Sequence, residues 1–129
     1  MAAEVELVTS VVHGIVADFA AHRREQYFAA FAPDATFVFP GQAAVLRSRA
    51  AYEAEWERWE REHGFRVRSC RSSAPHLQLR GTLAVFTHDV DTELEWDGEL
   101  VRNRERETIV LLARAGQWLC VHEHLSARP

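Results

Sequence analysis

The hydrophobic pattern of the first forty residues predicts two helices followed by a strand. Apolar residues recur at spacings of three and four from Val8 to Phe19, which is typical of a helix with one buried face. A second, shorter helix is expected over residues 24–32 and should end at Pro33, because proline cannot donate a backbone hydrogen bond. Residues 34–39 then have the pattern of a short strand.

A third helix is expected between Ser48, which can cap its first turn, and Gly64, which can end it. Tyr52, Trp56 and Trp59 lie three or four residues apart and therefore share one side of this helix. Large aromatic residues at this spacing are usually core residues, which favours a packing role. We also keep all three as candidate ligand contacts.

After residue 64 the pattern changes to alternation, which predicts four long strands over residues 65–80, 82–96, 99–113 and 117–126. Asp97-Gly98 is a strong two-residue hairpin signal, and two further turns contain glycine. Strands of this length must twist and coil. The predicted fold is therefore α+β, with one domain over residues 1–129: three N-terminal helices close a strongly curved antiparallel sheet into a cone, in the order α-α-β-α-β-β-β-β.

Counting outward from the Asp97-Gly98 turn gives the register of the central hairpin. It places His88 opposite Glu107, on the face that carries most of the apolar residues. On the other face it stacks three pairs of opposite charge, which are Asp89 with Arg106, Asp91 with Arg104, and Glu93 with Arg102.

The same count, continued through the next turn without a bulge, places His124 opposite Glu107 and Val121 beside Val110. Ser73 is expected to flank His88, although Pro75 can shift the outermost strand by one residue. Besides the three aromatic residues of the third helix, the candidate ligand contacts on the inward face are Arg71, Phe86, Ile109, His122 and Ser126.

A carboxylate between two imidazoles in an apolar cavity predicts a proton relay. Glu107 would orient His88 and His124, and such general acid–base catalysis contributes about 100- to 10,000-fold in rate. Two other interpretations stay open. The three residues can form a buried structural network, or His88, Glu107, His122 and His124 can hold a metal ion. No phosphate loop or other cofactor motif occurs, so no cofactor is predicted.

The net charge of −4 comes with interspersed acids and bases, and this argues against nucleic acid as a partner. No run of about 18 apolar residues predicts a membrane span, and the first residues do not resemble a signal peptide, so a cytoplasmic location is expected. The counted register also gathers an apolar patch on the outer face of the sheet, which predicts a homodimer. Its residues are Leu83, Val85, Val110, Leu112, Leu119 and Val121.

The element order, the segment FAPDATFVF and the ending QWLCVHEHLS resemble the nuclear transport factor 2-like superfamily, and within it the SnoaL-like proteins. The resemblance implies a commonly dimeric cone with a hydrophobic cavity that His122, His124 and Ser126 face. The superfamily includes ketosteroid isomerases, cyclases, dehydratases, epoxide hydrolases and non-catalytic assembly domains. Phe39 stands where the isomerases carry an aspartate base, and Ile15 falls near their tyrosine, which argues against steroid isomerisation.

The leading functional hypothesis is binding of a small apolar or aromatic molecule, with acid–base isomerase, cyclase or dehydratase turnover as its chemical extension. The first alternative is a non-catalytic ligand-binding or oligomerisation domain. The second is a metal-dependent enzyme that uses the pocket histidines.

Overall fold

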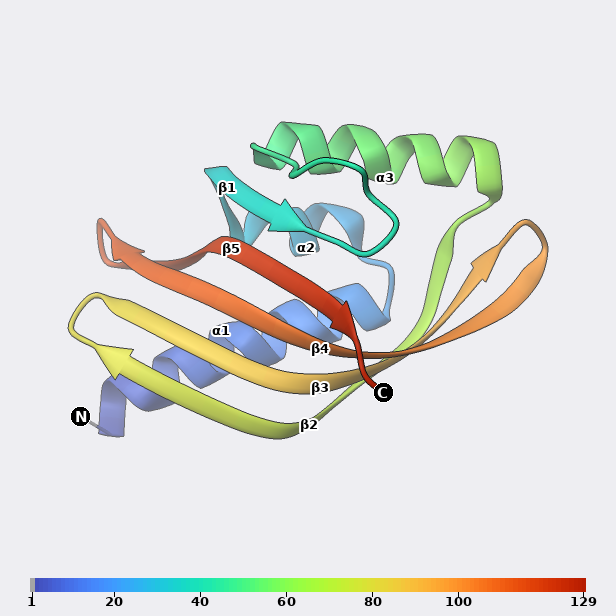
Figure 1. Ribbon diagram of the computed structural model, residues 1–129. Helices are drawn as coiled ribbons and strands as arrows, with labels where there is room; N and C mark the ends of the chain where they lie inside the picture. Colours follow the sequence, from blue (N-terminus) through green and yellow to red (C-terminus); the bar gives the residue numbers. More distant parts are fainter. Residues whose placement is uncertain (1) are drawn as a thin grey trace.

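The computed structural model describes residues 2–129 and confirms the predicted α+β class. Figure 1 shows a strongly bent sheet whose concave side carries the helices. The helices are α1 (Ala2–Ala20), α2 (Arg24–Ala29) and α3 (Arg49–His63). The strands are β1 (Phe31–Val38), β2 (Arg66–Arg80), β3 (Leu83–Trp96), β4 (Glu99–Arg114) and β5 (Gln117–Ala127).

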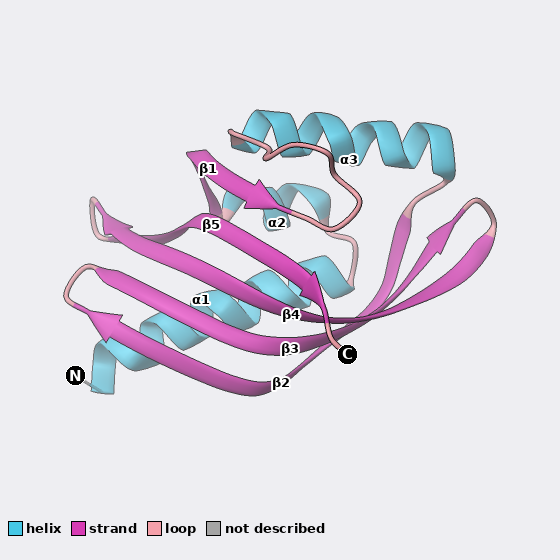
Figure 2. Cartoon of the chain, in the orientation of Figure 1, coloured by secondary structure: helices cyan, strands magenta, loops and turns pink. Residues whose placement is uncertain are grey.

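The strands form one sheet in the order β1-β5-β4-β3-β2 (Figure 2). Strands β2 to β5 are joined as an antiparallel meander, and β1 pairs with β5 in parallel. The β3–β4 hairpin extends beyond the end of β5 and curls toward the C-terminal end of α3 (Figure 1). The concave face of the sheet and the helices therefore enclose a space between them.

The ends of α3 follow the sequence signals. The Ser48 side chain accepts a hydrogen bond from the Ala51 backbone at 3.0 Å, and Gly64 adopts a left-handed conformation with φ of 61°. The predicted end of α2 is wrong, because this helix stops at Ala29 and Pro33 lies inside β1. Since β1 is an edge strand, one of its sides forms no ladder, and a residue without a backbone N–H is tolerated there.

The predicted register of the β3–β4 hairpin is confirmed along its full length, from Trp96 opposite Glu99 to Leu83 opposite Leu112. Asp97 and Gly98 both have positive φ angles, 54° and 79°, as a two-residue hairpin turn of this kind requires. His88 consequently lies opposite Glu107 on the inner face.

The predicted register between β4 and β5 is wrong beyond Val121. Leu111 pairs with Cys120, but Val110 pairs with His122, so Val121 is an extra residue in a β-bulge. Because successive side chains alternate between faces, one extra residue moves every following side chain to the opposite face. His124 thus pairs with Thr108 rather than with Glu107.

A similar shift occurs on β2 around Pro75, where the register changes between Ser73 and His76. Ser73 pairs with Asp89 on the outer face, and Ser72 takes the inward position beside His88. The expectation that Ser73 flanks His88 is therefore corrected by one residue. Proline at a bulge of an edge strand is the arrangement that its missing N–H favours.

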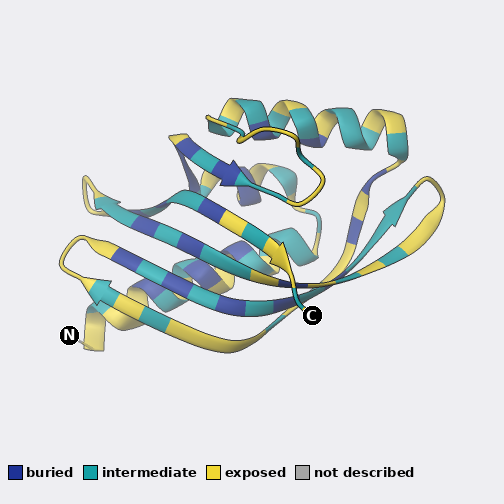
Figure 3. Cartoon of the chain, in the orientation of Figure 1, coloured by how far each residue is buried: buried dark blue, intermediate teal, exposed yellow. Residues whose placement is uncertain are grey.

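The core between helices and sheet is dominated by aromatic rings, among them the fully buried Trp56, Phe31 and Phe37. Figure 3 shows buried positions alternating with less buried ones along β3 and β4, as expected for a sheet packed on one face. No helix among residues 2–129 is long and apolar enough to cross a membrane.

Candidate functional site

A cavity of about 470 Å³ lies between the concave face of the sheet and the helices. Its walls are mostly apolar, and the helices contribute Ile15, Phe19 and Trp59. The strands contribute polar groups among apolar ones, including the carboxyl groups of Glu105, Glu107 and Glu123, which line the cavity. A space of this size and character is typical of a site for a small molecule.

A chain of hydrogen bonds leads from the sheet into this cavity. The Ser72 Oγ lies 2.5 Å from His88 Nδ1, and His88 Nε2 lies 2.8 Å from Glu107 Oε1. The His88 side chain is fully buried, whereas 14% of the Glu107 side chain is exposed. A carboxylate only accepts hydrogen bonds, so a neutral His88 donates from Nε2 and accepts from the Ser72 hydroxyl at Nδ1. Glu107 is the member of this chain that lines the cavity.

A second buried carboxyl group, that of Glu123, reaches the same region from β5. The Tyr27 hydroxyl donates to Glu123 Oε1 at 3.4 Å, and the Tyr27 and Tyr52 hydroxyls are 3.0 Å apart. All three side chains line the cavity, although Glu123 is only 1% exposed. Two phenols and a carboxyl group therefore face the ligand space beside Glu107.

Burial without a neighbouring cation sets the protonation of these groups. Burial raises the pKa of Glu123 well above its ordinary value, and the charge of Glu107 and a hydrogen bond with it raise this pKa further. Burial also raises the pKa of Glu107, against the opposite effect of its hydrogen bond with Glu123. Burial lowers the pKa of His88, which favours the neutral imidazole. The two carboxyl groups are thus coupled, and burial favours the protonated form of Glu123 most strongly.

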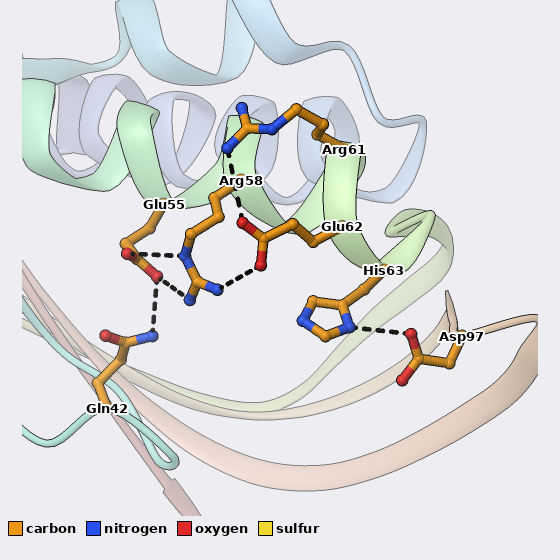
Figure 4. A network of polar contacts seen from close by, with 7 residues as sticks. All are labelled: Gln42, Glu55, Arg58, Arg61, Glu62, His63 and Asp97. Atoms are coloured by element: carbon orange, nitrogen blue, oxygen red, sulfur yellow. Dashed lines mark hydrogen bonds and ion pairs between the residues drawn. The ribbon is translucent and has the colours of Figure 1, made fainter.

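The rim of the cavity is fixed by polar contacts that Figure 4 shows. Arg58 of α3 lines the cavity and is held by Glu55 at 2.8 Å and by Glu62 at 3.2 Å. Gln42, in the loop after β1, donates to Glu55 at 3.4 Å. These contacts hold α3 and the loop together at the edge of the ligand space.

The tip of the β3–β4 hairpin is attached to the end of α3 in the same view. His63 Nδ1 lies 2.9 Å from Asp97 Oδ1 (Figure 4). The His63 ring stacks on Trp96 with 4.2 Å between the ring centroids. Trp96 is itself a lining residue. The hairpin therefore closes one side of the cavity.

The structure brings together only some of the residues predicted from the sequence. Tyr52, Trp59 and Glu107 line the cavity, and His88 lies directly behind Glu107. Trp56 is fully buried and donates from its indole nitrogen to Glu60 at 3.0 Å, so it is a core residue. Phe86 and Ile109 also belong to the core and do not line the cavity.

Four predicted site residues lie away from the cavity. Arg71 pairs with Asp91 and is exposed on the outer face, because the shift in β2 reverses its direction. The bulge at Val121 moves His122, His124 and Ser126 to the outer face, where His122 Nδ1 lies 2.7 Å from Thr36 Oγ1. The expectation that these residues face the cavity is therefore wrong.

The bulge also separates the residues of the proposed metal site. His122 and His124 lie on the outer face, whereas His88 and Glu107 lie on the inner face. Within residues 2–129, no group of three or more histidine, cysteine, aspartate or glutamate side chains is arranged to hold a metal ion. The four residues do not form a common ligand set.

Glu123, Tyr27 and Ser72 were missed by the sequence reasoning. Without the bulge, the alternation of β5 assigns Glu123 to the outer face. The sequence did contain one signal. The apolar residues Trp118 and Cys120 stand at even-numbered positions, whereas Leu125 stands at an odd-numbered one. When apolar residues of one strand change from even to odd positions, a bulge between them is indicated.

Comparisons with known proteins agree with this architecture. The family model of the SnoaL-like domain matches residues 8–129, whereas no curated protein matches the chain. An NTF2-like protein from Cytophaga hutchinsonii shares 12% sequence identity at a TM-score of 0.81, over 95% of this chain and 97% of that one.

Two further solved structures have names that point to different roles. A candidate dehydratase of the NTF2-like family from Streptomyces avermitilis shares 16% identity at a TM-score of 0.81, over 100% of this chain and 99% of that one. The CamKII hub homology domain from Chlamydamonas reinhardtii shares 20% identity at a TM-score of 0.75, with both chains covered completely. These likenesses establish the fold. Because the family model spans residues 8–129, the chain belongs to the SnoaL-like domain family.

Proposed function

We propose that this protein binds a small, largely apolar or aromatic molecule in the cavity and moves a proton on it through Glu107. The observation that carries the proposal is the chain Ser72–His88–Glu107, which ends at a carboxyl group in an apolar cavity. A carboxylate with few water neighbours is a stronger base than one in solution. The reaction class is isomerisation, cyclisation or dehydration.

The surrounding groups have complementary roles in this proposal. His88 donates one hydrogen bond to Glu107 and so orients the carboxylate that takes the proton. Glu123, whose raised pKa keeps it protonated, is the acid that returns a proton to the ligand. Tyr27 and Tyr52 remain protonated because burial raises the pKa of each hydroxyl, so they supply donors for negative charge that develops on an oxygen.

A test is possible without the natural substrate. 5-Nitrobenzisoxazole is a planar aromatic probe that opens when a base removes the proton on its C3 carbon. The C3 proton moves to the base, the N–O bond breaks, and its electrons remain on the phenolate oxygen of the same molecule. The absorbance of the phenolate reports the rate, and general-base catalysis contributes about 100- to 10,000-fold.

Glu107→Gln removes the base and keeps the shape of the side chain, so we expect the rate to fall about 100-fold or more. Glu93→Gln is the matched control, because Glu93 lies on the outer face, paired with Arg102 at 2.6 Å. Its rate should equal that of the natural sequence. An unchanged rate in Glu107→Gln, or an equal loss in both variants, would contradict the proposal.

We also propose that the outer face of the sheet forms a homodimer. Support comes from the apolar side chains of Leu83, which is 37% exposed, and of the half-buried Val85, Val110 and Leu112. The hub and association domains among the structural neighbours keep a non-catalytic assembly role as the second candidate function. The cytoplasmic location stays a prediction.

Light scattering after size exclusion should give twice the 14.7 kDa chain mass at micromolar concentration. Val110→Lys places a charge in the patch and should give the mass of one chain. A single-chain mass for the natural sequence would contradict the dimer.

A further inference from the structure

The floor of the cavity carries a second polar group, separate from the Glu107 chain. Thr92 of β3 pairs with Asn103 of β4, and Glu105 lies two residues from Asn103 on the same face. All three side chains line the cavity. Side chains two apart on a strand lie about 7 Å from each other, so Glu105 is one such step from Glu107.

One of these side chains is buried without a hydrogen-bonding partner: Thr92 is 7% exposed, and its Oγ1 is buried without a hydrogen bond. Glu105 is 9% exposed, and its carboxyl oxygens, which form no side-chain hydrogen bond or ion pair within residues 2–129, remain accessible from the cavity that they line. A buried polar group left without a partner costs about 1–3 kcal/mol. A ligand that donates hydrogen bonds here would remove this cost.

The charge of the cavity favours a positive ligand group. Glu105, Glu107 and Glu123 bring three carboxyl groups to its lining. Arg58 is the one basic side chain among the described lining residues, and Glu55 and Glu62 already bind it. Burial raises the pKa of Glu105, and no ion pair of its carboxyl group occurs within residues 2–129.

The aromatic walls of the same cavity suit a cation that carries an apolar body. Phe19, Phe65 and Trp96 line the same cavity, and aromatic faces attract ammonium groups. An anionic ligand would add a further negative charge beside these carboxyl groups and leave Glu105 and Thr92 without a suitable donor.

We infer that the ligand is an amine, protonated at neutral pH, whose ammonium group binds Glu105 and Thr92 while its apolar or aromatic part fills the cavity. This inference rests on the proposed function and specifies its substrate class. The reacting atom beside Glu107 then lies about 7 Å along the strand from the ammonium group. Glu105 and Thr92 select the substrate, and Glu107 acts on it.

Three probes that share one aromatic skeleton test this inference by calorimetric titration near pH 7.5. They are 2-(2-naphthyl)ethylamine, 2-(2-naphthyl)ethanol and 3-(2-naphthyl)propionate, which are cationic, neutral and anionic. We expect the amine to bind at least tenfold more tightly than the alcohol, and the propionate more weakly than either. This measurement needs no turnover, so it is independent of the 5-nitrobenzisoxazole assay.

Variants assign the preference to its residues. Glu105→Gln keeps the shape and removes the charge, so the affinity for the amine should fall about tenfold while that for the alcohol stays the same. Thr92→Val should lower the affinity for the amine about threefold. Glu93→Gln, which removes one charge from the outer face, should change neither affinity. The thermal unfolding midpoint of each variant confirms that it is folded.

Equal affinity for the amine and the alcohol, or an amine preference that survives in Glu105→Gln, would overturn the inference and leave the proposed function standing. Failure of all three probes to bind would also overturn the inference, and the 5-nitrobenzisoxazole assay would then decide the proposed function on its own. Amine binding without opening of 5-nitrobenzisoxazole would overturn the proton-transfer role of Glu107 and support the ligand class.

Discussion

The two faces of the β3–β4 hairpin carry the same acidic residue types in opposite electrostatic surroundings. On the outer face Glu93 pairs with Arg102, and a hydrogen bond from this guanidinium lowers the pKa of Glu93. On the inner face Glu105 and Glu107 have no cation beside them, and burial raises the pKa of each carboxyl group. The outer carboxylates fix the register, whereas the inner carboxyl groups can exchange protons.

This difference arises from the fold rather than from the residue type. Alternation along a strand sends neighbouring side chains to opposite faces, so Glu105 and Glu107 point inward and Arg104 and Arg106 outward. Arg102, Arg104 and Arg106 of β4 therefore lie on the side away from the cavity, together with the acidic residues of β3 that bind them. The hairpin therefore places its arginines on the outer face and leaves its inner carboxyl groups without an arginine partner.

Among variants that keep Glu107, the largest effect is expected from removing the donor behind this carboxylate. His88→Leu should lower the rate of 5-nitrobenzisoxazole opening about 10- to 100-fold, because Glu107 loses the group that orients it. It should also move the rise of the rate–pH profile to higher pH, since a hydrogen bond from the imidazole favours the charged carboxylate. A merely structural role would lower the rate without moving the profile, and that result would contradict the positioning role.

The next effect concerns the stability of the second inner carboxyl group. The pKa of Glu123 is raised in the folded state, so its contribution to stability is complete below the unfolded value of about 4.5 and is lost as pH rises through the folded value. Glu123→Gln resembles the protonated acid and does not titrate. Between pH 5 and pH 8, the free energy of unfolding of the variant in urea should rise by about 1 kcal/mol or more relative to that of the natural sequence.

A constant stability difference between these pH values would contradict the buried, protonated state of Glu123. Glu107→Gln provides a second comparison, because it removes the other member of the coupled carboxyl groups. In that variant the pH dependence contributed by Glu123 should weaken, since one of its causes is the charge of Glu107.

The smallest effect is expected on the outer face. Glu93 has a lowered pKa, so its contribution to stability is present above about pH 4.5 and is lost as pH falls through the folded value, the reverse of Glu123. Glu93→Gln should therefore shift the urea midpoint only slightly at pH 7. Salt screens exposed pairs, so 1 M sodium chloride should remove most of this shift. An effect as large as that of Glu123→Gln would remove the contrast between the faces.

The sequence allowed most of the fold to be predicted, because its strongest local signals agree with the structure. Asp97 and Gly98 both tolerate positive φ, and this fixed the whole β3–β4 register, including His88 opposite Glu107. Ser48 and Gly64 likewise marked the ends of α3. Each of these signals depends on the conformation of one or two residues.

The site was predicted only in part, because a bulge has no comparable signal. Val121 is an ordinary β-branched residue with no special turn chemistry. As the extra residue of the bulge, it turns the Glu123 side chain into the cavity and the His124 side chain to the outer face. Helical spacing likewise could not separate Trp56 from Trp59, since both lie on the same side of α3 and only packing depth makes one core and the other a lining residue. Thr92 was missed because an unpaired hydroxyl is visible only once its neighbours are known.

The most direct test of the account is a carbon-detected NMR titration of the glutamate side-chain carboxyl groups from about pH 3 to pH 9. The Glu93→Gln, Glu107→Gln and Glu123→Gln variants assign the signals. We expect Glu107 and Glu123 to titrate in two linked steps above the ordinary value for glutamate, and Glu93 to titrate below it. Titration of all three carboxyl groups together, near or below that value, would contradict it.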